Sequence, residues 1–219
     1  MSNDEHFKIV FEDTHILVVD KMPGLLSQGG DAPGPNLVDL LREYFGRNYV
    51  GLVHRLDRNT SGLMIVGKRS KSADRLTQSL QKGDLTREYL AFLQGNVTQD
   101  LVWRDWLTKN EATNTVRCSS QETPGSKLAV LGLKPVSKHA KGSLCRVKLE
   151  TGRGHQIRAQ AAHHGHPLAG DPKYAPADVA KIASRQALHS AFLSFPHPMS
   201  HERMDFESTW PKDLAHLCQ

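Results

Sequence analysis

The stretch VHRLDRNTSGLMIV, residues 53–66, places one carboxylate, Asp57, between the guanidinium groups of Arg55 and Arg58. A carboxylate beside cations stays ionised, which suits a nucleophile better than a general acid. In an extended segment Arg55 and Asp57 would project to one side, with Leu56 between them. The Thr-Ser-Gly that follows is typical of a turn, and the apolar run after it predicts an anchoring strand. Alternatively, Asp57 caps a turn with solvated arginines, the usual meaning of an isolated Arg-x-Asp.

A second basic cluster is ETGRGHQIR, residues 150–158. Its two glycines allow close backbone approach, and a predicted helix starts directly after them. Helix N-termini attract anions such as phosphates, and Arg153, His155 and Arg158 add positive charge there. The alternative is a strand-to-helix turn with a solvated basic end.

Tyr89 is the third candidate, in the predicted strand REYLAFLQG after Arg87 and Glu88. A tyrosine in a strand usually packs in the core. The functional alternative is a platform on which a nucleic-acid base stacks, with a hydroxyl that can take part in proton transfer.

The histidines His163, His164 and His166 invite a zinc interpretation. We set it aside because adjacent helical histidines point in different directions and no nearby cysteine or carboxylate completes a tetrahedral set. The motifs HExxH, GxxxxGK[ST] and GxGxxG are absent. We therefore expect no metal and no cofactor.

The elements that position these residues follow from hydrophobic spacing and turn signals. We predict strands at residues 7–11, 16–20, 62–68, 87–95 and 143–152, and helices at residues 37–45, 70–82 and 154–164. Gly46, Gly83 and Gly165 end the helices. The polar segment 108–142 reads as strands joined by exposed loops and as the expected subdomain boundary. Strands and helices without regular alternation predict an α+β fold with a mixed, mainly antiparallel sheet.

Composition sets outer limits on function. The 219 residues suffice for one large domain or two tightly joined subdomains. Three scattered cysteines without a CxxC suit a reducing cytoplasm, the polar start is no signal peptide, and no apolar run approaches a membrane span. A net charge of +5 and a pI of about 9.2 are compatible with nucleic acid without demanding it.

These residues resemble the RluA-type RNA pseudouridine synthases, whose signature HRLDRNTSG matches around Asp57. Four further blocks appear in the family's order: DKMPGLLS, REYLAFLQG, TGRGHQIRAQAAHHGHPLAGDPKY, and the C-terminal LHSAFLSFPHP with FESTWP. The match covers residues 8–211. It implies a single catalytic domain over residues 1–219, without the N-terminal S4-type RNA-binding domain that many members carry.

The resemblance also implies residue roles. Asp57 would be the nucleophile, and Arg55 would enter the RNA stack where the target uridine is flipped out. Tyr89 would stack on the uracil and help remove the C5 proton. Arg158 would pair with Asp57 and keep it charged, and Ile157 would line the pocket. We assign RNA contacts to Arg55, Arg153, His155 and Lys21, and the substrate pocket to Leu56 and Ile157.

Two positions depart from the family pattern. Met22 follows Lys21 where proline is usual, with Pro23 one place later, and Gln160 stands where many members have histidine. Neither position touches the expected chemistry. They leave open how the N-terminal loop and the third-block helix meet the RNA.

The sequence therefore predicts a cytoplasmic, monomeric isomerase that turns uridine into pseudouridine in ribosomal or transfer RNA stem-loops, with no membrane partner. Two alternatives remain at this point: a catalytically silent RNA-binding module on the same fold, and a cofactor-free hydrolase that uses Asp57 on a small nucleoside. No motif identifies the target uridine.

Overall fold

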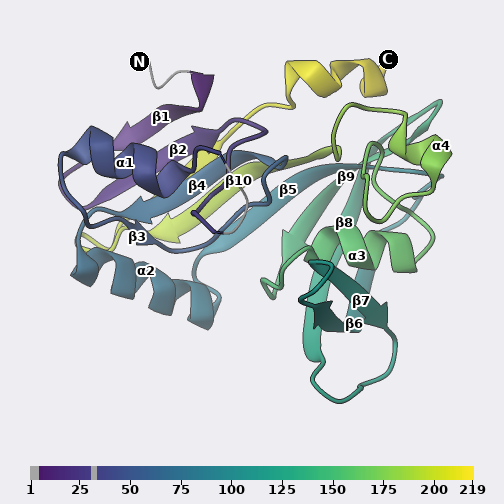
Figure 1. The fold of residues 1–219 in the computed structure, drawn as a ribbon, viewed down its shortest axis with the longest axis horizontal. Coiled ribbons are helices and arrows are strands. Elements are labelled where there is room, and N and C mark those ends of the chain that lie inside the picture. The colour runs from purple at the N-terminus through teal and green to yellow at the C-terminus, as the bar shows by residue number, and fades with distance from the viewer. Residues whose placement is uncertain (1–4, 31–33) are drawn as a thin grey trace. The chain divides into compact units, whose positions relative to one another are not determined.

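The computed structural model describes residues 5–30 and 34–219, which form two compact units joined by the chain (Figure 1). Unit 1 holds the described residues up to Arg87 together with Ser190–Thr209, and unit 2 holds Glu88–His189 and Trp210–Gln219. Helices and mainly antiparallel strands occur in both units, so the predicted α+β class is confirmed.

Unit 1 is built on a sheet with the order β1-β2-β4-β10. Its strands are β1 (Phe7–Glu12), β2 (Ile16–Lys21), β4 (Ser61–Gly67) and β10 (Leu188–Pro196, which begins in unit 2), with β11 (Arg203–Glu207) on β10 and β3 (Gly51–Leu52) on β4. Strands β2 and β4 pair antiparallel, and Lys21 lies opposite Gly62 at the end of this ladder. The segment that carries Asp57 is the connection from β3 to β4.

Two capped helices belong to unit 1. Helix α1 (Leu37–Phe45) begins at Asn36, whose side chain accepts from the Asp39 N–H at 3.0 Å, and it ends at Gly46 in the left-handed conformation. Helix α2 (Ser70–Lys82) ends in the same way at Gly83 and packs against β3 and β4. Both predicted helices and both glycine caps are thus confirmed.

The core of unit 1 explains the uninterrupted apolar runs in its sequence. On one face, side chains from β2, β4 and β10 pack together with α2, and the cluster comprises Ile16, Val18, Leu63, Ile65, Leu76, Leu85, Leu193 and Phe195. The alternate residues Leu17, Val19, Met64 and Val66 are also completely buried. The central strands are therefore covered on both faces, which fixes their register and the start of each loop that leaves them.

Unit 2 contains an antiparallel sheet with the order β5-β9-β8-β6-β7. Its strands are β5 (Thr86–Leu93, which begins in unit 1), β6 (Leu101–Asn110), β7 (Thr115–Ser119), β8 (Lys127–His139) and β9 (Gly142–Leu149). Helix α3 (Gln156–His163) packs against β6 and β7, and α4 (Ala177–Ala180) and the 3-10 helix η2 (Lys212–Cys218) follow.

The subdomain boundary expected within residues 108–142 is wrong, because this whole segment lies inside unit 2. Its polarity comes from the half-buried outer strand β7 and the exposed turns before and after it. The strands expected there are present.

None of the helices in the described part of the chain is both long and apolar enough to cross a membrane.

Gly62 provides a test of the packing between β4 and β10. Its φ of +112° is strained for any L-residue, and an added Cβ would lie 2.2 Å from the Ser190 carbonyl oxygen. We expect Gly62→Ala to lower the free energy of unfolding by more than about 2 kcal/mol in urea titrations. Gly132→Ala, where a Cβ meets nothing within 4 Å, is the control and should change it little. Equal stability of the two variants would contradict this packing.

Candidate active site

The backbone around Leu56 is held by one serine hydroxyl. The Leu56 N–H donates to Ser27 Oγ at 2.9 Å, and Ser27 Oγ donates to the Leu56 carbonyl at 2.7 Å. Both residues are buried, so these bonds satisfy main-chain groups that water does not reach. Beyond Leu56, the Thr60 N–H donates to the Asp57 carbonyl at 3.1 Å and closes the turn. The main chain on both sides of Asp57 is thus fixed.

Lys21 holds the same loop from the end of β2. Its side chain is completely buried, and Nζ donates to the carbonyls of Met22, Leu25 and Arg58 at 2.9, 2.8 and 3.0 Å. The Arg58 carbonyl also accepts from the Gly24 N–H at 2.9 Å. The expectation that Lys21 binds RNA does not fit this position, because its ammonium is turned inward and used to join two loops.

His54 joins the start of the Asp57 loop to strand β4, a role that the sequence did not indicate. Its side chain is buried, and Nε2 accepts from the Ile65 N–H on β4 at 3.2 Å. Burial, and then the positive charge of Arg87, lower the pKa of His54 to about 3. The imidazole is therefore neutral at neutral pH and serves as a hydrogen-bond acceptor of the sheet.

The charged side chains of HRLDR differ in exposure. Arg55 is exposed, whereas Asp57 and Arg58 are half-buried. Unit 1 thus brings together four of the predicted residues: Lys21 at the end of β2, and Arg55, Leu56 and Asp57 on the connection from β3 to β4. It presents the half-buried carboxylate of Asp57 close in sequence to the exposed Arg55, on a main chain that hydrogen bonds from Lys21 and Ser27 hold.

Arg158 forms the main polar interaction of unit 2. Its Nε and Nη2 donate to the two carboxylate oxygens of Asp171 at 2.7 and 2.8 Å, and both side chains are buried. Burial alone would raise the pKa of Asp171, but the hydrogen bonds and charge of Arg158 and the amides of Lys173 and Tyr174 lower it. No sequence pattern singled out Asp171 as a partner of Arg158, although it belongs to the GDPKY block. The pairing of Arg158 with Asp57 stays a prediction.

Tyr174 links the start of α3 to this pair. The Arg158 guanidinium lies 5.1 Å from its ring centroid, and its hydroxyl contacts His155 Nδ1 at 2.7 Å and accepts from the Val116 N–H at 2.8 Å. His155 adopts a left-handed conformation with φ 52° just before α3. Unit 2 therefore does bring His155 and Arg158 together, through a tyrosine that the sequence analysis left without a role.

The remaining predicted residues of unit 2 have clear positions. Arg153 is exposed, and its Nε donates to the Leu128 carbonyl at 3.0 Å. Ile157 is buried, and so is Tyr89, which pairs with Val147 in the β5–β9 ladder. Their roles toward a substrate stay predictions.

The expectation that no cysteine or carboxylate lies near His163 and His164 is wrong. Asp105 from β6 and Cys118 from β7 each offer a ligand atom within 4.8 Å of one from His163. His164 Nε2 also contacts Asp105 at 2.9 Å. His163 lies 45 residues after Cys118 and 58 after Asp105 in the chain, so only the fold reveals that the three are close together.

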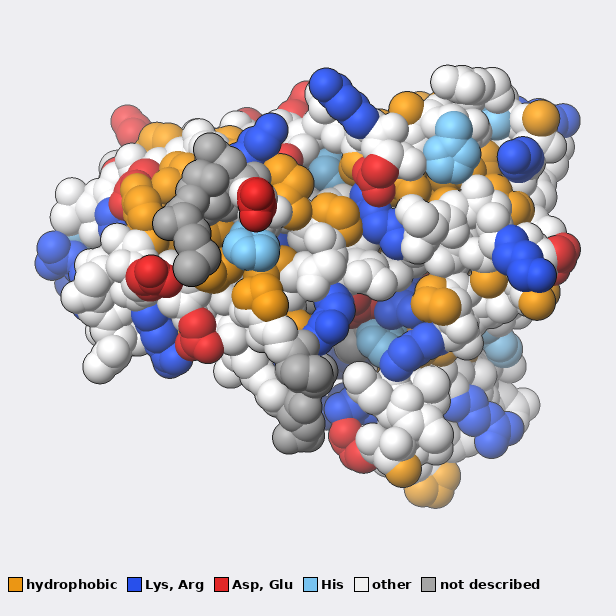
Figure 2. Space-filling model, turned by 45° about the horizontal axis from the view of Figure 1, so that its top comes forward, with side chains coloured by type: hydrophobic (Ala, Val, Ile, Leu, Met, Phe, Trp, Pro, Cys, Tyr) orange, Lys and Arg blue, Asp and Glu red, His pale blue; other side chains and the backbone are white. Residues whose placement is uncertain are grey.

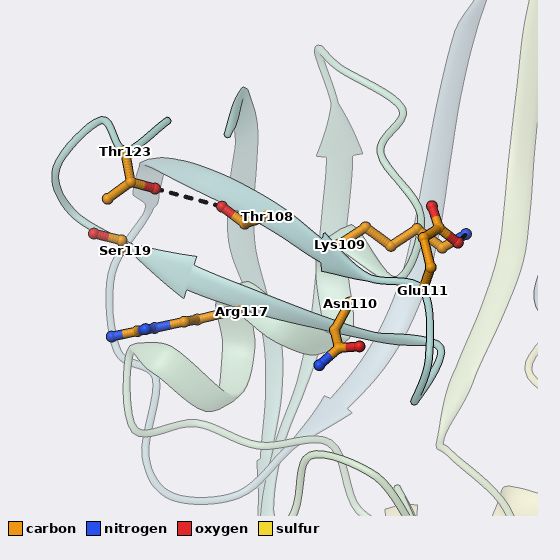
Figure 3. A pocket seen from close by; sticks show the side chains of 7 residues that line it. All are labelled: Thr108, Lys109, Asn110, Glu111, Arg117, Ser119 and Thr123. Atoms are coloured by element: carbon orange, nitrogen blue, oxygen red, sulfur yellow. Dashed lines mark hydrogen bonds and ion pairs between the residues drawn. The ribbon is translucent and has the colours of Figure 1, made fainter. Parts of the chain in front are cut away.

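A pocket of about 570 Å³ lies on the β6–β7 hairpin of unit 2 (Figure 3). It is lined by Thr108, Lys109, Asn110, Glu111, Arg117, Ser119 and Thr123. None of the predicted site residues lines it. The surface in Figure 2 carries Lys and Arg side chains interspersed with Asp and Glu, so charge alone does not mark a binding path on that face.

Comparison with known proteins identifies the relatives of this chain. A profile of the family described as RNA pseudouridylate synthase matches residues 15–163. The ribosomal large subunit pseudouridine synthase D of Pseudomonas aeruginosa is 34% identical over 234 residues, which cover 99% of this chain and 72% of that protein. The protein of the same name from Nitrosomonas europaea is 35% identical over 97% of this chain and 64% of its own length.

A solved structure agrees with these matches. Human RNA pseudouridylate synthase domain containing 1 superposes with a TM-score of 0.77 at 25% identity, over 94% of this chain and 84% of the human chain.

The Arg158–Asp171 pair predicts a pH-dependent contribution to stability. Because the pKa of Asp171 is lowered in the folded state, the stabilisation is fully present above its unfolded pKa of about 3.9 and is lost as pH falls through the lower folded value. At pH 7 we expect Asp171→Asn to cost about 3–5 kcal/mol, since it removes the buried negative charge that accepts two hydrogen bonds from the Arg158 guanidinium. Urea unfolding of wild type and variant at stepped pH measures the difference, which should shrink in acid.

The matched control is Asp100→Asn, because Asp100 is exposed and only loosely paired with Lys134 at 3.6 Å. Its effect should stay within about 0.5 kcal/mol at every pH. A pH-independent cost for Asp171→Asn would show that its charge contributes nothing to the pair.

Proposed function

The chain belongs to the RNA pseudouridylate synthase family, and from this premise we propose that it isomerises uridines of ribosomal RNA with Asp57 as the nucleophile. As a member of that family it is an isomerase that acts on RNA. The relatives with 34–35% identity are named for the large ribosomal subunit, which favours ribosomal over transfer RNA as the substrate. Transfer RNA is the second candidate.

The observation that carries this proposal is the set of hydrogen bonds that hold the main chain around Asp57. Ser27, Lys21 and the Thr60 amide bond the main chain around it, while its side chain is only half-buried. An ordinary solvated turn has no need of a completely buried lysine. A reacting group does need a fixed backbone, because small misplacements of a nucleophile cost large factors in rate.

The chemistry requires only the protein's own groups and the RNA. The N1–C1′ bond of uridine breaks, the base turns, and C5 joins C1′; the C5 proton leaves and N1 gains a proton. Electrons balance within the nucleoside, so no oxidant or reductant enters. The Asp57 carboxylate either attacks C1′ directly or removes a ribose proton to give a glycal, and it is regenerated at the end.

The other predicted residues have roles toward the same substrate. Base chemistry requires the uridine to leave its stack at a cost of a few kcal/mol, and the exposed Arg55 is suited to fill the vacated space. We propose that Tyr89 stacks on the uracil and helps remove the C5 proton, and that Arg158 keeps Asp57 charged. Arg153 and His155 would contact phosphates of a single-stranded loop, with Leu56 and Ile157 forming apolar walls.

The proposed substrate also suggests where the protein works and how it binds. Ribosomal RNA is made and assembled in the cytoplasm of bacteria such as those that supply the relatives, and we propose that location here. We also propose that the protein works as a monomer, and that its RNA binding weakens with salt as phosphate contacts do.

The central experiment measures tritium release from uridine C5 in unmodified ribosomal and transfer RNA transcripts. Wild type should release tritium from ribosomal RNA, and Asp57→Asn should be slower by at least about a thousandfold, because it removes the nucleophile. Asp100→Asn, an exposed carboxylate with no proposed role, is the control and should match wild type. RNA binding by Asp57→Asn should persist and remain sensitive to salt.

Three results would contradict parts of the proposal. Full tritium release by Asp57→Asn would remove Asp57 as the nucleophile. Release from transfer RNA alone would leave the isomerase intact and overturn the ribosomal substrate. Binding without release by wild type would instead support the catalytically silent module.

A further inference from the structure

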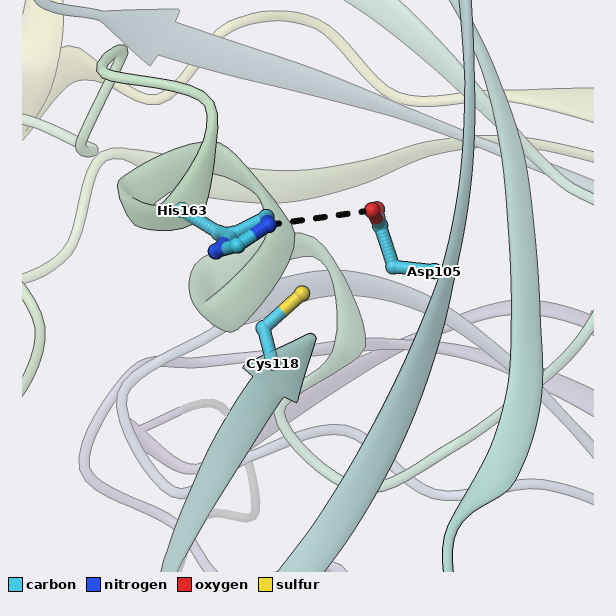
Figure 4. Close-up of side chains that lie close together, drawn as sticks. All are labelled: Asp105, Cys118 and His163. Atoms are coloured by element: carbon cyan, nitrogen blue, oxygen red, sulfur yellow. Dashed lines mark ion pairs between the residues drawn. The ribbon is translucent and has the colours of Figure 1, made fainter. Parts of the chain in front are cut away.

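A cluster of three side chains in unit 2 has no part in the proposed reaction (Figure 4). Asp105 lies on β6, Cys118 on β7, and His163 is the last residue of α3. In Figure 4 the carboxylate, the thiol and the imidazole point toward a common space. A carboxylate oxygen, a thiol sulfur and an imidazole nitrogen are the three ligand types that bind Zn²⁺ in proteins.

The distances are close to those of a tetrahedral site. One ligand atom from each residue lies within 4.8 Å of the other two, and His163 Nε2 is 4.0 Å from Asp105 Oδ1. Bonds to zinc of about 2.0–2.3 Å put tetrahedral ligand atoms about 3.3–3.8 Å apart. Side-chain adjustments of less than about 1 Å therefore close the site around an ion, with no change in the backbone.

The carboxylate of Asp105 is already held as a metal ligand would be. Its Oδ2 accepts from Gln160 Nε2 at 2.7 Å and contacts His164 Nε2 at 2.9 Å, while Oδ1 is the oxygen nearest His163. The His164 ring stacks on Trp103 at 4.7 Å with an interplanar angle of 8°. Such outer hydrogen bonds orient ligating carboxylates and strengthen metal binding.

A second observation concerns Gln160, which is completely buried beside Asp105. Its Oε1 has no hydrogen-bond partner among the described residues, although buried acceptors are nearly always satisfied. A water molecule on a bound metal ion would supply the missing donor. The orphaned oxygen and the three converging ligands are independent features of the same corner of unit 2.

We propose that Asp105, Cys118 and His163 form a Zn²⁺ site, with water as the fourth ligand. The thiol and the imidazole favour Zn²⁺ over Mg²⁺ or Ca²⁺, which prefer sites made of oxygen atoms. The ion would join α3 to the β6–β7 hairpin, two elements that already pack on one another. Because α3 also carries Arg158, a metal here would stiffen the helix that presents a predicted site residue.

The test uses Co²⁺ as a spectroscopic stand-in for Zn²⁺ on the full chain after treatment with a chelator. We expect one Co²⁺ per chain and a thiolate-to-cobalt charge-transfer band. Cys118→Ser should abolish the band. Cys145→Ser and Cys218→Ser are matched controls, since these free cysteines lie outside the cluster, and they should keep it.

The imidazole is tested in the same titration. His163→Ala should weaken Co²⁺ binding at least tenfold, whereas His216→Ala, an exposed histidine outside the cluster, should leave it unchanged. Zn²⁺ should raise the melting temperature of wild type but not of Cys118→Ser, because only a ligand of the native state stabilises it. A circular dichroism spectrum equal to that of wild type verifies that each variant is folded.

Either of two results overturns the proposal. One is the absence of a charge-transfer band in wild type at saturating Co²⁺. The other is equal binding in wild type, Cys118→Ser and His163→Ala, which would mean that the ion sits elsewhere on the chain.

Discussion

The buried ammonium of Lys21 is the interaction on which the Asp57 loop depends. Removing a charged ammonium from water is costly unless hydrogen bonds replace its hydration. Here three carbonyls do so, two from the loop that follows β2 and one, of Arg58, from the loop that carries Asp57. A cation in this place ties together segments 37 residues apart, and a shift of the Asp57 loop would break its bond to the Arg58 carbonyl. The position of the carboxylate is therefore coupled to the stability of unit 1.

In unit 2, too, a buried cation is held by hydrogen bonds, here to a carboxylate. Arg158 is held at two nitrogens by Asp171 and covered by Tyr174, which in turn bonds to the backbone of β7. In both units a charged side chain that the sequence marks for chemistry or RNA contact is supported by buried polar partners. Such networks stabilise little beyond what a packed apolar core would, but they permit few alternative geometries. Catalysis needs that restriction more than it needs stability.

The sequence predicted those features that depend on local patterns. Helices α1 and α2 and their caps at Gly46 and Gly83 follow from spacing and from the conformational freedom of glycine. The role of Lys21 did not, because its partners are main-chain carbonyls that no residue pattern encodes. The Asp105–Cys118–His163 cluster likewise depends on strand pairing over tens of residues. The subdomain boundary predicted in segment 108–142 was wrong because an outer strand and its turns can be polar without linking two subdomains.

The most direct test of this account is hydrogen exchange of the Leu56 and Thr60 amides in Lys21→Met, together with its tritium release. Methionine keeps an apolar stem and removes only the ammonium. We predict much faster exchange at both amides and a matching loss of turnover, while Lys8→Met, an exposed lysine of β1, behaves as wild type. If Lys21→Met does not fold, Ser27→Ala tests the same clamp at Leu56. Unchanged exchange and full turnover in Lys21→Met would contradict the claim that its ammonium holds the loop.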